Sequence, residues 1–182
     1  MGAVQFRQYG SADAQAVWDL HEWAMRAAGT EPADIPGTDD LRDIDGRYLD
    51  TGGEFLVGLL TEDGPADADA VGSDLPRTTD GAVAAIGGYL PNEVGHADER
   101  TVPGAAELHR MRVAPPCQRR GIGRDLLHRL EARAAEDGFE LLLATTARRQ
   151  AAAVEFYRDE GYDCVGESME GEYELVHFEK RL

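Results

Sequence analysis

The sequence has almost no lysine and a large excess of acid. Only one of its 18 basic residues is a lysine, Lys180, and 35 acidic residues bring the formal net charge to −17. Repulsion at this charge weakens the folded state unless salt screens it. We therefore expect a protein from a halophile with a salt-rich cytoplasm; an acidic mesophilic protein is the alternative. The same charge disfavours nonspecific binding to nucleic acid.

Long apolar runs and cysteine clusters are also missing. The longest apolar stretches, FLVGLL and FELLLA, have the length of strands, far short of the roughly 18 residues of a membrane span. The N-terminal MGAVQFRQYG lacks the basic and apolar regions of a secretory signal. Two cysteines, Cys117 and Cys164, predict neither a metal site nor a disulfide framework. These features predict a cytoplasmic protein without a membrane partner.

The apolar patterning predicts an α/β fold, and 182 residues suit one domain. The expected strands are 4–9, 54–60, 82–90, 105–113, 139–145, 162–166 and 172–182. The expected helices are 11–29, 40–49, 121–138 and 151–160. Strands and helices alternate in the second half, which predicts at least one parallel pairing around FELLLATT. An acidic stretch over about 62–81 is expected to be a loop insertion.

The segment PCQRRGIGRDLL, residues 116–127, is basic within this acidic chain. Residues 107–133 hold seven arginines against three acidic residues, a net charge of +4, so the remaining residues sum to −21. So local an excess of positive charge favours a phosphate-bearing ligand, and a solvated basic helix face is the alternative.

The turn in this segment has the composition of an anion site. A Pro-Pro pair ends the preceding strand, and Gly121 and Gly123 stand at the start of a helix. Free amides at a helix N-terminus attract anions, and a glycine lets a phosphate approach the backbone. The arginines expected around the phosphate are Arg119, Arg120 and Arg124.

Two common phosphate-binding motifs are excluded. The turn lacks G-x-x-x-x-G-K-[ST], and no lysine lies near it. A dinucleotide fingerprint requires a third glycine where Leu126 stands. A nucleotide-binding oxidoreductase is therefore disfavoured.

The stretch ELHRMRVAPPCQRRGIGRDLL resembles the acetyl-CoA-binding motif of the GNAT superfamily of N-acetyltransferases. Its signature is Q/R-x-x-G-x-G/A, and Gln118, Gly121 and Gly123 fill the three places. Downstream, TTARRQAAAVEFYRDEGYDCVGE resembles the family's second conserved segment. The resemblance covers about 107–167 and is looser before that. It implies one N-acetyltransferase domain over 1–182, with a mixed, twisted central sheet of about six to seven strands flanked by helices on both faces.

The same resemblance implies acetyl-CoA as co-substrate and no metal. Backbone amides from Gln118 to Arg124 would hold the pyrophosphate, and the backbone of Met111 to Val113 would pair with the pantetheine arm like an added strand. The fourth strand is expected to bulge and to splay from the fifth. Gln150 is expected near the pantetheine, with helix capping as the alternative. The full set of expected cofactor-binding residues is Met111, Arg112, Val113, Gln118, Arg119, Arg120, Gly121, Ile122, Gly123, Arg124 and Gln150.

Direct transfer to an amine requires a base. An alkylammonium of pKa near 10.4 must lose a proton first, which costs about 4.6 kcal/mol at pH 7. The resemblance makes Glu107 the expected base; a water chain, a relay shared with His109, or a structural pairing of Glu107 with Arg148 or a neighbour are alternatives. It also makes Tyr157 the residue that hydrogen-bonds the sulfur and acts as general acid, with a purely structural core position as the alternative.

The acceptor is open. We expect a primary amine of a small molecule or amino acid, with residues 23–48 as one wall of its site. A protein N-acetyltransferase and a noncatalytic acyl-CoA-binding or sensing domain are the alternatives. Arg42 and Arg47 could bind an acceptor carboxylate or balance nearby aspartates, while Trp18 and Trp23 are expected in the core. A homodimer is an expectation from the family.

Overall fold

The computed structural model describes residues 4–34, 37–60, 74–94 and 100–182, and its centre is a seven-stranded sheet. The strands are β1 (Val4–Gln8), β2 (Glu54–Leu60), β3 (Ala82–Pro91), β4 (Ala105–Val113), β5 (Leu141–Ala147), β6 (Asp163–Glu170) and β7 (Tyr173–Arg181). The α-helices are α1 (Ala14–Ala27), α2 (Ile44–Arg47), α4 (Ile122–Glu136) and α5 (Ala151–Asp159). The strand order is β1-β2-β3-β4-β5-β7-β6. This confirms the predicted α/β fold with a mixed sheet.

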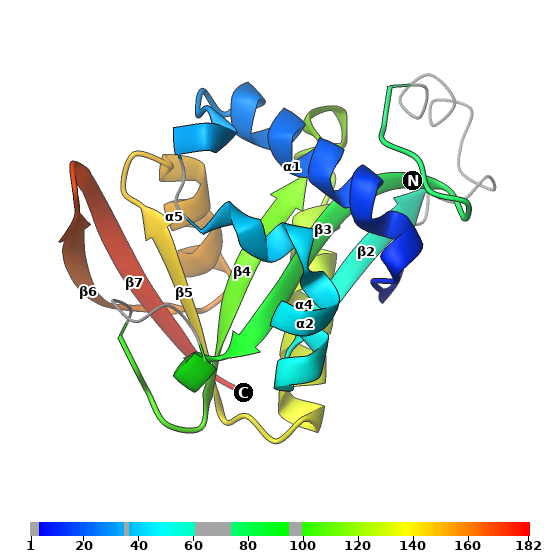
Figure 1. Cartoon of the computed structure of the whole chain (residues 1–182). Coiled ribbons are helices and arrows are strands. Elements are labelled where there is room, and N and C mark those ends of the chain that lie inside the picture. The colour runs from blue at the N-terminus through cyan, green and yellow to red at the C-terminus, as the bar shows by residue number, and fades with distance from the viewer. Residues whose placement is uncertain (1–3, 35–36, 61–73, 95–99) are drawn as a thin grey trace.

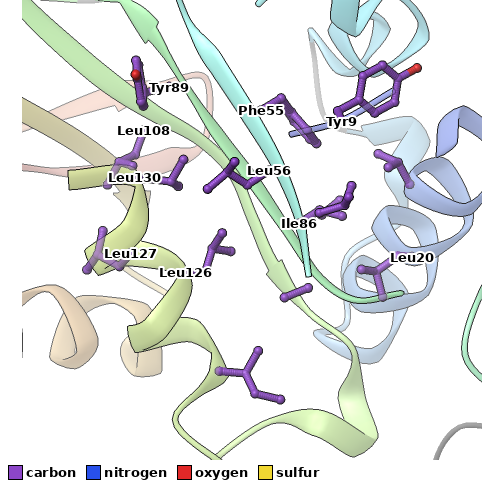
Figure 2. Close-up of a cluster of buried hydrophobic side chains, with 14 of the residues drawn as sticks. Tyr9, Leu20, Phe55, Leu56, Ile86, Tyr89, Leu108, Leu126, Leu127 and Leu130 are labelled. Carbon is purple, nitrogen blue, oxygen red and sulfur yellow. The ribbon is translucent and has the colours of Figure 1, made fainter. Parts of the chain in front are cut away.

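Within the described sheet, β4 and β5 are parallel and every other neighbouring pair is antiparallel. The parallel pair includes FELLLATT, as the sequence predicted. Helices α1 and α2 lie in front of the sheet in Figure 1, and α4 and α5 lie behind it. Figure 2 shows the two cores that result: Leu126, Leu127 and Leu130 of α4 pack on one side of the strands, and Leu20 of α1 packs on the other.

Three predicted boundaries differ from the structure for local reasons. The first helix is preceded by a short 3-10 turn over Ser11–Asp13, where the Asp13 carboxylate accepts the Gly10 amide at 2.9 Å. Strand β5 starts two residues late because the amide of Phe139 still bonds the Ala134 carbonyl at 3.0 Å, in a Schellman motif that ends α4. Strand β6 runs to Glu170 instead of 166, because it pairs along its length with β7.

Two predicted segments need further correction. Residues 30–40, expected as loop, include 3-10 turns over Pro32–Asp34 and Thr38–Arg42. The helix expected over 40–49 is only the four-residue α2, flanked by 3-10 turns. Most of the acidic insertion expected over about 62–81 lies outside the described residues. No helix in the described part of the chain is both long and apolar enough to cross a membrane.

The parallel pairing of β4 and β5 is short, and the candidate site lies where the two strands separate. Strands β4 and β5 pair at only three positions, the last of which joins Glu107 and Leu143, and they separate beyond it (Figure 1). On its other side β4 bulges: two residues, Arg110 and Met111, lie opposite Gly87 of β3. Arg110 takes a φ of 55° there, and a Cβ on Gly87 would approach the Met111 sulfur to 2.7 Å. The expected bulge and splay of β4 are both confirmed.

Candidate functional site

The turn between β4 and α4 presents a row of free amides. In the described chain, no acceptor receives a hydrogen bond from the amides of Arg119 through Arg124. Gln118 closes the turn instead, because its own amide bonds the Pro115 carbonyl at 3.3 Å and its Nε2 bonds the Val113 carbonyl at 3.1 Å. The free amides expected from the sequence are thus present from Arg119 onward, Gln118 closes the turn, and the binding of an anion there stays a prediction.

The two signature glycines differ in backbone conformation, and only one of them is required by the fold. Gly121 has a φ of 84°, the left-handed conformation that favours glycine, and no described atom lies within 4 Å of where its Cβ would stand. Gly123 has an ordinary helical backbone, and a Cβ there would lie 3.5 Å from Val113 Cγ2, a normal contact. The fold therefore requires glycine at 121 and tolerates a side chain at 123. Close approach of a ligand to the Gly123 backbone stays a prediction.

The arginines around this turn are not equivalent. Arg119 and Arg120 are exposed and form no ion pair with a described residue. Arg124 is bound at 2.5 Å to the buried Glu160, the residue that follows α5, and Glu160 also contacts His128 Nε2 at 2.8 Å. Arg124 thus ties the start of α4 to the end of α5, and the free positive charge at the turn comes from Arg119 and Arg120.

The free edge of β4 leads from this turn toward Glu107. The Met111 carbonyl accepts Arg112 Nη1 at 2.8 Å, and the Val113 carbonyl accepts Gln118. Each carbonyl oxygen keeps a second lone pair. Because β5 has separated by this point, the strand edge expected to bind the pantetheine arm pairs with no strand in the described part of the chain.

Glu107 lies where β4 and β5 part, with only 4% of its surface exposed. Its Oε2 accepts Asn92 Nδ2 at 2.8 Å, and its Oε1 accepts Thr145 Oγ1 at 3.2 Å. Pairing with Arg148 is wrong, because Arg148 binds Glu167 and Glu174; the other form of that alternative, a bond to a neighbour, is present in the contacts with Asn92 and Thr145. A buried carboxylate that accepts hydrogen bonds from these two neutral donors, beside the opening between β4 and β5, can act as a proton acceptor.

Tyr157 approaches from the opposite face of the sheet. A second Schellman motif ends α5, in which the Tyr162 amide bonds the Tyr157 carbonyl at 3.0 Å and the two rings meet edge to face at 5.4 Å. With Phe178 at 5.6 Å, this packing fixes the ring. Burial raises the pKa of Tyr157 to about 12, against the opposing effect of the positive Arg112. Its hydroxyl forms no hydrogen bond with a described residue, so it can donate to a ligand.

Gln150 stands on the Tyr157 side of the sheet, at the start of α5. Its side chain makes no capping bond; its Oε1 accepts Thr146 Oγ1 at 3.2 Å. The capping alternative is therefore wrong, and a contact with the cofactor stays a prediction.

The α1 side of the cleft holds buried polar groups. Arg110 binds Asp40, and Tyr48 donates to the same carboxylate at 2.6 Å. Burial, together with Arg110, lowers the pKa of Arg112 to about 10, and its Nε has no hydrogen-bond partner among the described residues. His21 is fully buried, burial lowers its pKa to about 3, and neither ring nitrogen is hydrogen-bonded within the described structure.

The predictions for the tryptophans and for the two arginines of the acceptor wall have different outcomes. Trp18 and Trp23 pack against the core, as expected. Arg42 lies over the Trp18 ring at 3.4 Å and is exposed, and Arg47 is exposed as well. His109 shares the Glu107 face of β4, with its ring 6.4 Å from that of Tyr48. Neither exposed arginine lies among the buried polar groups.

Sequence reasoning missed several polar residues at the site. Asn92, Thr145 and His177 were assigned no role, and Arg112 was assigned only its backbone. The bulge sets the direction of the Arg112 side chain. The family resemblance predicts a bulge in this strand, but no local pattern predicts which way Arg112 points. Within the described residues no group of histidine, cysteine and acidic side chains could hold a metal ion.

Solved structures share this fold over nearly the whole chain. A GNAT-family acetyltransferase from Staphylococcus aureus Mu50 superposes with a TM-score of 0.73 at 14% identity, covering 98% of this chain and 99% of that one. A protein from Salmonella typhimurium, solved with its cofactor acetyl-CoA, gives 0.66 at 18% identity, with 98% and 94% covered. A ribosomal-protein-alanine N-acetyltransferase from Brucella melitensis gives 0.66 at 20% identity, with 98% and 99% covered.

At these identities the likeness establishes the fold. A comparison with curated protein sequences gives no significant match. The model of the acetyltransferase (GNAT) family matches residues 17–162, which include the glycine turn, Glu107 and Tyr157. The chain therefore belongs to the GNAT family of acetyltransferases.

Proposed function

We propose that the protein transfers the acetyl group of acetyl-CoA directly to the primary amine of a small molecule or amino acid. The observation that carries this proposal is the separation of β4 from β5, with Glu107 at its closed end and Tyr157 on the other face of the sheet. The free amides of the α4 turn lie at the far end of β4. A thioester and an amine can meet in such an opening.

The residues present fit acetyl-CoA. A diphosphate needs several convergent donors and positive charge, and the amides of Arg119 to Arg124 with two free arginine side chains supply both. The free edge of β4 offers backbone groups to an extended amide-bearing chain. When bound, acetyl-CoA supplies an acetyl group activated as a thioester. The protein positions and desolvates the reactants.

Glu107 takes the proton of the acceptor ammonium in this proposal. Loss of that proton costs about 4.6 kcal/mol at pH 7 in water. Asn92 and Thr145 hold the two oxygens of Glu107 in place beside the opening. The amine then attacks the thioester carbonyl as the free base.

Tyr157 donates a hydrogen bond to the departing sulfur. A pKa of about 12 keeps the hydroxyl protonated throughout the neutral range. Full proton transfer to a thiolate of pKa about 8.5 would be uphill by about 4 to 5 kcal/mol. The hydroxyl therefore stabilises negative charge on the sulfur as a donor, and the thiolate collects its proton after release.

Arg112 favours an acceptor that carries a carboxylate. A partly buried guanidinium whose buried Nε has no hydrogen-bond partner among the described residues is most stable opposite an anion, and Arg112 shares a face of β4 with Glu107. An amino acid presents an amine and a carboxylate together. A protein N-terminus is the second candidate acceptor, because the Brucella melitensis relative is a ribosomal-protein-alanine N-acetyltransferase.

The test follows thiol release from acetyl-CoA in molar KCl across amines, amino acids and peptides with free N-termini. We expect turnover with small amines, with amino acids preferred over their methyl esters. Arg112→Met should remove this preference, and Arg112→Lys should keep part of it. Tyr157→Phe should lower kcat about tenfold or more while leaving the Kd for acetyl-CoA unchanged.

Each failure has a distinct meaning. Binding of acetyl-CoA without turnover of any acceptor would favour a noncatalytic sensing domain. Turnover of peptides alone would move the acceptor to proteins. Absence of acetyl-CoA binding at every salt concentration would overturn the proposal.

A further inference from the structure

We propose that Glu107 releases the proton it takes from the acceptor along a chain of three side chains, Thr145, His177 and Ser168, which ends at the protein surface. This inference rests on the proposed role of Glu107 as the base. It assigns functions to Thr145 of β5, Ser168 of β6 and His177 of β7. Ser168 and His177 lie outside the two segments that carry the family resemblance, and Thr145 is the first residue of the second segment.

The chain consists of three hydrogen bonds in series. Thr145 Oγ1 lies 3.2 Å from Glu107 Oε1, His177 Nδ1 lies 3.1 Å from Thr145 Oγ1, and Ser168 Oγ lies 2.7 Å from His177 Nε2. Glu107 is buried, Thr145 and His177 are partly buried, and Ser168 is exposed. The chain thus leads from the buried carboxylate to solvent.

Strand register explains why these groups meet. Glu107 pairs with Leu143, two residues before Thr145 on the same face of β5. Thr145 pairs directly with His177 of β7, and Ser168 of β6 is the diagonal neighbour of His177. All four side chains therefore lie on one face of the sheet, opposite the face that holds Tyr157.

The donors and acceptors are compatible with proton movement in one direction per cycle. With Glu107 ionised, Thr145 donates to the carboxylate, so its oxygen accepts Nδ1–H of His177, and Nε2 accepts the hydroxyl of Ser168. Once Glu107 has taken the amine proton, the hydroxyl of Thr145 rotates toward His177. The imidazole reaches the matching tautomer by exchange with solvent: Nε2 gains a proton from water at Ser168 and Nδ1 releases its proton to water, so the neutral ring carries one proton, on Nε2.

The O–H bond of protonated Glu107 breaks and a new O–H bond forms on Thr145, while the original hydroxyl proton of Thr145 forms a bond to His177 Nδ1. The resulting imidazolium loses its Nε2 proton to water at Ser168. Glu107 is left ionised for the next cycle. Histidine suits this step because its ordinary pKa lies near neutrality.

The surroundings support a relay at this place. A cavity of about 10 Å³ lies against Glu107, Thr145 and His177, which is about the size of one water molecule. Arg100, on the segment before β4, lines the same cavity and is bound to Glu179 at 3.0 Å. Glu179 thus neutralises the charge of Arg100, so this ion pair adds no net charge beside the chain of hydrogen bonds.

The first test needs no acetyl transfer. We would record the ring ¹⁵N shifts of the His177 side chain at alkaline pH, where the ring is neutral, and assign them with His177→Gln. Protonation at Nδ1 is expected in the wild type. In Glu107→Gln, Asn92 still donates to the amide oxygen, so the amide NH₂ faces Thr145 and donates to it. The hydroxyl must then turn to His177, and protonation is expected to move to Nε2.

His128 serves as the internal control, because its partner is Glu160 on the other side of the molecule. Its shifts should not change. If His177 keeps the same tautomer in both proteins, the chain is not coupled to Glu107 and the proposal is overturned.

The second test measures the relay in catalysis. Thr145→Val keeps the shape and removes the hydroxyl, and we expect kcat to fall about 10- to 100-fold with the acetyl-CoA Kd unchanged. Thr145→Ser should recover kcat to within about threefold. His177→Gln should lower kcat, whereas His128→Gln should leave it unchanged.

These outcomes separate the relay from the base. If Thr145→Val keeps full kcat while Glu107→Gln loses it, the base stands and the relay is overturned. If Glu107→Gln keeps full kcat, the base role itself fails. A merely structural Thr145 would lower the melting temperature and cofactor affinity along with kcat, and Thr145→Ser shows which of these changes follow the hydroxyl.

Discussion

Arg110 Nε lies 2.9 Å from Asp40 Oδ2, and both side chains are about nine-tenths buried. Arg110 is also the residue of the β4 bulge with a φ of 55°, and its Nη2 donates to the Gly37 carbonyl at 2.7 Å. The ion pair therefore holds a strained strand position and fastens the segment before α2 to β4. The shape of the acceptor wall depends on this contact.

Removing one partner of this pair should destabilise the protein strongly. We expect Asp40→Ala to lower the free energy of unfolding by about 3 kcal/mol or more, because it leaves a buried guanidinium and the Tyr48 hydroxyl without their acceptor. Urea unfolding in molar KCl measures the change. Glu22→Ala removes the same charge from an exposed pair with Arg26 and should cost less than about 1 kcal/mol. Equal losses in both variants would contradict the prediction.

The two signature glycines should respond differently to alanine. Gly121→Ala should lower the free energy of unfolding by about 1 to 2 kcal/mol, because its φ of 84° is unfavourable for a residue with a Cβ. Gly123→Ala should leave stability unchanged or slightly higher while weakening acetyl-CoA binding tenfold or more. Calorimetric titration and urea unfolding separate the two effects. Unaltered binding in Gly123→Ala would remove the close backbone approach.

His21 should make the protein sensitive to acid. Its folded pKa of about 3 lies below the ordinary 6.5, so the unfolded state binds more protons between these values. Stability from the neutral ring is complete above pH 6.5 and is lost as pH falls toward 3. At pH 4.5 the loss is about 2 to 3 kcal/mol. In His21→Leu this part of the pH dependence should vanish, so the two unfolding curves converge on acidification. Parallel curves would refute it.

Salt should stabilise the fold. With a net charge of −17, repulsion between surface carboxylates falls as the screening length shrinks from about 10 Å at 0.1 M to about 3 Å at 1 M. We expect the melting temperature, followed by circular dichroism, to rise steadily from 0.1 to 2 M KCl. NaCl should act equally at equal ionic strength. A constant melting temperature across this range would argue against dependence on salt and for an acidic mesophilic protein.

The sequence predicted the features that depend on neighbouring residues. Gly138 and Gly161 mark the ends of α4 and α5, apolar alternation marks the strands, and the glycines at 121 and 123 mark the anion turn. These signals are local, because backbone conformation and capping are decided within a few residues. The family pattern placed Glu107 and Tyr157 on the same grounds.

The partners of Glu107 could not be predicted in this way. Asn92 is 15 residues away along the chain and Thr145 is 38 residues away, and both reach the carboxylate only through the pairing of several strands. The direction of Arg112 depends on the bulge in β4, where Arg110 contacts Asp40, a residue 70 positions away along the chain. Such placements follow from register, which no short motif encodes.

The three paired positions between β4 and β5 divide the sheet into two half-sheets. One consists of β1, β2, β3 and β4 and the other of β5, β7 and β6, and the two are joined only at one end of β4 and β5. The hydrogen bond from Thr145 to Glu107 crosses this joint. A small rotation of one half against the other would widen the mouth of the opening and lengthen that bond together. Admission of reactants and escape of the proton would then depend on one mechanical coordinate, the angle between the halves.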